Sequence, residues 1–140
     1  MDTIKTEDFL KDIVYLFRET FEGSPEGQGS AYLDRGTGFF STLEALSAEA
    51  VSKDINGTTI AAQTEHAKFY LDRVADMMKG KTEPIKWEQS WLIETVNEQE
   101  WDALRMTVRR TYEDVLATLA SVYPSWMASR MAPMEAMRVE

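Results

Sequence analysis

Residues 58–79, TTIAAQTEHAKFYLDRVADMMK, carry the pattern on which the predicted fold rests. The apolar and small residues of this segment recur at steps of three and four, as on one face of an α-helix, at Ile60, Thr64, Ala67, Leu71, Val74 and Met78. Asn56-Gly57 supplies a turn before it, and Thr58 or Thr59 can accept a hydrogen bond from an unpaired N–H at the helix start. Gly80 predicts the end. We therefore expect a long amphipathic helix here.

Other segments carry the same periodicity. Residues 4–21 form one helical pattern, which the glycine-rich residues 23–29 end. A second pattern begins at Ser30 and runs to Leu46, with a weakened first half because it contains two glycines. A further helix follows Asn97, which can pair with Glu100 at the helix start. Because β-type alternation is absent, these patterns predict an all-α protein, one domain over residues 1–140, built as an antiparallel four-helix bundle with a short C-terminal helical tail.

The amino-acid composition limits the kinds of binding partner that we expect. The 140 residues have a formal charge of −9 and no basic cluster, so the chain repels phosphate backbones and acidic headgroups. We expect neither a nucleic-acid nor a membrane partner. The chain contains no cysteine, which excludes disulfides and thiolate metal ligands. Its start is acidic and no apolar run reaches the ~20 residues that span a bilayer, so a cytoplasmic protein is expected.

Three segments resemble a known family. TIAAQTEHAKFYLDRV at residues 59–74, WEQSW at 87–91 followed by VNEQEWDAL at 96–104, and AMR at 136–138 are similar to segments of the DinB-like superfamily. This group of four-helix-bundle proteins includes low-molecular-weight-thiol transferases and mycothiol-dependent maleylpyruvate isomerases. The resemblance covers nearly the whole chain. It implies a bundle whose typical members hold one divalent metal with three histidines, one on the third helix and a His-x-x-x-His pair on the last.

The matching positions lack those histidines. The resemblance places Gln63 at the third-helix ligand position and Ser129 and Pro133 at the last-helix pair. His66, the chain's only histidine, matches a position that is often histidine without binding metal. An amide is a weak ligand for zinc or nickel, a serine hydroxyl binds them poorly, and proline has no donor side chain. No cofactor is therefore expected, with zinc or nickel as the alternative.

Helical geometry predicts how far Gln63 and His66 lie from the apolar face of the third helix. On a 3.6-residue helix, Gln63 lies roughly 60° and His66 roughly 120° from the centre of the apolar stripe. We therefore expect Gln63 to point toward the interior more readily than His66. Gln63 is either a polar contact inside a small-molecule pocket or a core-edge amide bonded to a neighbouring helix. His66 is either a metal ligand or general base, or a boundary histidine with local hydrogen bonds, which we favour. Glu65 is expected to be a solvated charge.

The tryptophans have two possible roles. Trp87, Trp91 and Trp101 are candidates to line a ligand cleft, but such residues more often cap a bundle or clamp a long loop onto it. Phe69 lies opposite the apolar stripe, which favours a homodimer surface that includes it. The methionines of the tail are expected to pack a terminal helix against the bundle.

Two functional hypotheses result. The first is a non-catalytic or functionally divergent, metal-free DinB-like protein that forms a homodimer. It binds a small ligand or protein partner at the vestigial metal site, with Gln63, His66, Ser129 and Pro133 as the candidate binding residues. The second is a metal-dependent transferase or hydrolase of the thiol S-transferase type that uses His66 with non-standard ligands. An altered or truncated last helix is a third explanation of the missing histidines.

Overall fold

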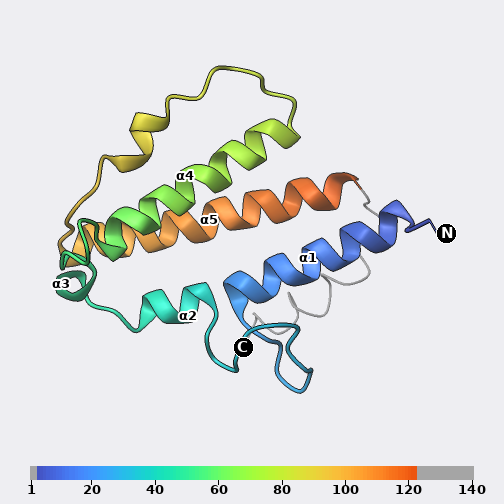
Figure 1. Ribbon diagram of the computed structural model, residues 1–140, viewed down its shortest axis with the longest axis horizontal. Coiled ribbons are helices and arrows are strands. Elements are labelled where there is room, and N and C mark those ends of the chain that lie inside the picture. Colours follow the sequence, from blue (N-terminus) through green and yellow to red (C-terminus); the bar gives the residue numbers. More distant parts are fainter. Residues whose placement is uncertain (1–2, 123–140) are drawn as a thin grey trace.

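The computed structural model describes residues 3–122 and is all-α over that range, without a strand (Figure 1). Its elements are α1 (Thr6–Glu22), α2 (Phe39–Glu44), α3 (Ala48–Val51), α4 (Ile60–Met78), the 3-10 helix η1 (Trp87–Trp91) and α5 (Glu98–Val122). The predicted C-terminal helical tail, with Ser129 and Pro133, lies outside the described residues. Among residues 3–122, no helix is both long and apolar enough to cross a membrane.

The predicted ends of the long helices are confirmed. Thr59 caps α4, because its hydroxyl accepts a hydrogen bond from Ala62 N at 3.0 Å. At the start of α5, Glu100 N donates to Asn97 Oδ1 at 2.9 Å and Asn97 N donates to Glu100 Oε2 at 2.8 Å. This reciprocal pair satisfies two N–H groups that the helix leaves unpaired. Gly80, at φ 80°, follows the last residues of α4 and stops it.

The antiparallel arrangement is wrong for the pair α4 and α5, which run in the same direction (Figure 1). Thr59 Oγ1, before α4, donates to the carbonyl of Glu94, before α5, at 2.5 Å. Toward the other end of both helices, Lys79 Nζ contacts Asp114 Oδ2 at 2.6 Å. Residues 79–97 carry the chain back along the outside of α4 to the end where that helix began. Because this connection is long, α5 can start beside the start of α4 and run parallel to it.

The helix expected from Ser30 is shorter than predicted, because only the six residues of α2 are helical there. The break falls in its first half, where the two glycines were expected to weaken it. Gly36 has φ 79°, which is unfavourable for a residue with a side chain. Gly38 lies against the end of α1, where a Cβ atom would come within 2.5 Å of Gly23 N. Glycines that form a turn and permit a close backbone contact therefore replace the first half of the predicted helix with a loop.

Glu19 of α1 organises this loop. The residue is 1% exposed, and its carboxylate accepts hydrogen bonds from Ala31 N at 2.8 Å and from Tyr32 N and Leu33 N at 2.9 Å each. The N–H of Tyr32 is the largest influence that lowers the pKa of Glu19 below its ordinary value of 4.5, while burial acts in the opposite direction. One carboxylate thus satisfies three consecutive backbone donors of a segment without regular structure.

We expect Glu19→Gln to lower the melting temperature at neutral pH, because a neutral amide cannot accept all three hydrogen bonds as the carboxylate does. The folded-state pKa of Glu19 is lowered, so its contribution to stability is complete above the unfolded-state value and lost as pH falls through the folded-state pKa. The difference between wild type and variant should therefore shrink below about pH 4.5, as thermal melts across pH would measure. Glu26→Gln, at an exposed position in the same loop, is the control. Equal melting of both variants at neutral pH would contradict this role.

The core lies where α5 meets the other helices. Tyr112 is buried among the aromatic rings of α1 and α2, and its hydroxyl donates to Glu22 Oε2 at 3.0 Å. The predicted apolar faces are only partly buried: Phe9 of α1 is 54% exposed and Val74 of α4 is 43% exposed. The core is therefore concentrated around the middle of α5. The first turns of α1 and the last turns of α4 contribute little to it.

Candidate functional site

Within the described residues, three neighbouring polar side chains of α4 point to three different sides of the helix. Gln63 points to the side of α2, His66 to the side of η1, and Glu65 to the side of α5. Gln63 and His66, which the sequence analysis grouped at one vestigial metal site, therefore lie in different surroundings. The structure does not bring them together.

Gln63 is exposed at the rim of an apolar pocket of about 300 Å³. The pocket is lined by Phe39, Leu43, Ile55, Thr58, Thr59, Ile60, Gln63 and Thr64. Gln63 Nε2 donates to Thr58 Oγ1 at 3.0 Å, so the amide is bonded to the turn before α4 and not to a neighbouring helix. The expectation that Gln63 lies deeper than His66 is wrong, because the connection between α4 and α5 covers the His66 side of the helix.

His66 holds that connection onto α4. Its ring stacks on Trp91 with centroids 3.9 Å apart and planes at 17°, and its Nδ1 lies 2.9 Å from Ser90 Oγ. Ser90 is fully buried and donates its one hydroxyl hydrogen to the carbonyl of Trp87 at 2.7 Å. His66 Nδ1 therefore donates to Ser90 Oγ. The half-buried position of His66 agrees with the boundary histidine that we favoured, but its hydrogen-bond partner lies 24 residues away in the sequence and is not local.

The tryptophans differ in role. Trp87 packs on Tyr70 and Phe69, with centroids 5.2 and 6.1 Å apart, and Trp91 covers His66, so both clamp the connection onto α4. Trp91 also lines a cleft, whereas Trp101 is completely buried. Phe69 was expected to face solvent in a monomer, but it is half-buried between Trp87 and Arg73. The homodimer stays a prediction that light scattering would test.

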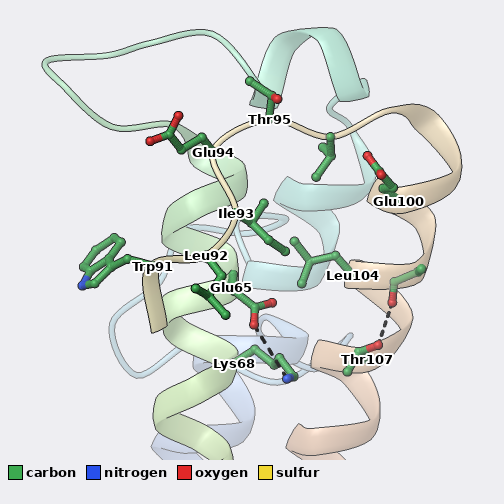
Figure 2. Close-up of a pocket in the computed structure, with 12 residues that line it drawn as sticks. Glu65, Lys68, Trp91, Leu92, Ile93, Glu94, Thr95, Glu100, Leu104 and Thr107 are labelled. Atoms are coloured by element: carbon green, nitrogen blue, oxygen red, sulfur yellow. Dashed lines mark hydrogen bonds and ion pairs between the residues drawn. The ribbon is translucent and has the colours of Figure 1, made fainter. Parts of the chain in front are cut away.

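Sequence reasoning missed a larger cleft between α4, the segment after η1, and α5 (Figure 2). Its volume is about 680 Å³ and its lining residues are Glu65, Lys68, Trp91, Leu92, Ile93, Glu94, Thr95, Val96, Glu100, Ala103, Leu104 and Thr107. The side chain of Glu65 is only 17% exposed, so the expectation of a solvated charge is wrong. The available signal was the spacing of Glu65, Lys68 and Asp72, which places three charges on one side of α4.

Glu65 is the electrostatically unusual group of this cleft. Burial raises its pKa, the positive charge of Lys68 lowers it, and the negative charge of Asp72 raises it again. Lys68 Nζ lies 3.9 Å from Glu65 Oε1 and 3.3 Å from Asp72 Oδ2, so it is shared between two carboxylates. Asp72 also accepts a hydrogen bond from Thr111 of α5 at 3.1 Å. A carboxylate with a raised pKa in a cleft is a candidate binding group.

The described residues do not fit the metal of the resembling family. Around Gln63 the pocket offers apolar side chains and threonine hydroxyls, which are poor ligands for zinc or nickel. Across residues 3–122, no three His, Asp or Glu side chains gather in a way that could hold a metal ion. A comparison of the chain with protein-family models, with curated proteins and with solved structures gives no match.

Proposed function

We propose that this chain is a DinB-like helical protein without the family's metal centre, and that it binds a small, largely apolar molecule in the pocket beside Gln63. One observation carries the proposal: the position where the resemblance expects a metal-binding histidine holds an amide at the rim of an apolar pocket. A pocket of this kind, apolar with a few placed polar groups, suits small organic ligands.

The polar groups of the pocket support this function. Gln63 donates one N–H to Thr58, so its carbonyl and its second N–H remain to orient a ligand. Thr59 and Thr64 direct their hydroxyl hydrogens to the backbone carbonyls of Glu94 and Ile60 and therefore cannot donate to a bound molecule. Apolar contact would supply the affinity and Gln63 the orientation. The volume of about 300 Å³ limits the ligand to roughly the size of two or three fused or linked aromatic rings.

The test is a fluorescence titration with N-phenyl-1-naphthylamine, a neutral aromatic probe that brightens in apolar surroundings. We expect saturable binding by the wild type and about tenfold weaker binding by Ile55→Trp, because an indole at the pocket mouth takes up the probe's space. Ile55 is 51% exposed, so the larger side chain does not disturb the core. Ile4→Trp is the matched control, since Ile4 is exposed and does not line the pocket.

Two results would overturn the proposed pocket. One is an absence of saturable binding by the wild type, and the other is equal affinity of Ile55→Trp and the wild type. In the second case the probe binds elsewhere, for example on the exposed apolar side chains of α1.

A further inference from the structure

The cleft between α4 and α5 differs from the Gln63 pocket in its position and in its charge. We propose that it binds a small organic cation, with the ammonium group against the Glu65 carboxylate and the apolar part of the ligand against Ile93 and Leu104. This site is independent of the proposed Gln63 pocket, because the two share no lining residue.

The geometry brings both kinds of contact to one opening. In Figure 2, Glu65 and Lys68 reach in from α4, Ile93 from the connection, and Leu104 and Thr107 from α5. The volume of about 680 Å³ lies within the range of small-molecule sites. Because charged and apolar side chains face the same space, the cleft suits a molecule with one charged end and one apolar end.

The charges of the lining select the sign of the ligand. Glu65, Glu94 and Glu100 line the cleft together with one cation, Lys68. Lys68 lies between the carboxylates of Glu65 and Asp72, so its positive charge is already shared. The whole chain carries a formal charge of −9, which adds to the negative field. A cation is attracted into this cleft and an anion is repelled from it.

The burial of Glu65 favours an organic cation. Its carboxylate is removed from most of its water, and its Lys68 partner is 3.9 Å away, which is long for an ion pair with a hydrogen bond. An ammonium group entering the cleft would supply the hydrogen-bonded counter-charge that the carboxylate lacks. Hard metal cations need about six oxygen ligands, and the described residues contain no cluster of three carboxylates suited to one.

The opposite wall supplies the apolar contact and one more acceptor. Leu104 is buried at the base of the cleft, and Ile93 packs against the core from the connection. Thr107 donates its hydroxyl hydrogen to the carbonyl of Ala103 at 2.8 Å, so its oxygen can accept a hydrogen bond from an ammonium N–H. The ring or chain of the ligand would then cover Ile93 and Leu104 and remove apolar surface from water.

Benzylamine is the probe that tests this site, compared with benzyl alcohol and benzoate, which have similar shape and different charge. We expect benzylamine to bind saturably to the wild type and to shift the NMR signals of the Trp91 indole and the Thr107 methyl group. Benzyl alcohol should bind at least about tenfold more weakly, and benzoate should not bind. Glu65→Gln should weaken benzylamine binding about tenfold, while Glu49→Gln, whose side chain is 86% exposed on α3, should not change it.

Three results would overturn the inference: equal binding of benzylamine and benzyl alcohol, equal binding by Glu65→Gln and wild type, or no shift of the Trp91 and Thr107 signals. The comparison of the three probes uses the unmodified protein, so it decides the question even if Glu65→Gln does not fold. Failure of the naphthylamine probe at the Gln63 pocket would leave these results unaffected.

Discussion

Replacing Gln63, Ser129 and Pro133 together by histidine is expected to raise the affinity for zinc by about a thousandfold or more. The resemblance to the DinB-like superfamily places these three positions where typical members hold their metal. Three imidazole nitrogens with an open fourth position form a common zinc site, whereas an amide, a hydroxyl and a proline do not. The expected readout is one zinc ion per chain by plasma mass spectrometry, together with a higher melting temperature when zinc is added.

Two controls make this experiment informative. The wild type, purified without chelator or histidine tag, should carry no stoichiometric zinc, nickel or manganese and should show no thermal shift with them. Gln63→His alone should behave like the wild type, because one added imidazole cannot hold zinc tightly. Stoichiometric metal in the wild type would contradict the metal-free function and favour an enzyme that uses His66. Failure of the folded triple variant to bind zinc would contradict the matching of these positions with the family.

Trp101→Ala is expected to lower the free energy of unfolding by about 3–5 kcal/mol. Trp101 has no exposed surface, so the substitution opens a cavity in the centre of the core. Its Nε1 donates to the carbonyl of Leu46 at 2.9 Å, and the alanine leaves that carbonyl without its donor. Domains are commonly stable by about 5–15 kcal/mol, so this loss is a large part of the total. Urea unfolding followed by circular dichroism measures it.

Trp87→Ala is the matched control, because it removes the same side chain from a position that is 46% exposed. Its loss should be clearly smaller, since the ring is nearly half exposed and packs on Tyr70 and Phe69 of α4. Equal losses for the two variants would contradict the assignment of Trp101 to the core and Trp87 to the clamp. An unfolded Trp101→Ala with a folded Trp87→Ala would support it.

Patterns within the amino-acid sequence were enough to predict the helical class and the ends of the long helices. Thr59, Gly80 and the pair Asn97 and Glu100 mark those ends through contacts within a few residues of the chain. Such contacts depend on local spacing, which periodicity and capping patterns record directly. Helical periodicity also placed His66 away from the centre of the apolar stripe of α4, as expected of a surface or boundary histidine.

The arrangement of those helices, and the choice of which α4 side chains are covered, depend instead on contacts between segments far apart in the sequence. The parallel course of α4 and α5 depends on the path of residues 79–97, and no helical period encodes the direction in which a long connection returns. That path covers His66 and leaves Gln63 exposed, which reverses their predicted ranking. It also shields Glu65, since a helix pattern shows which side a residue occupies but not which distant segment packs there.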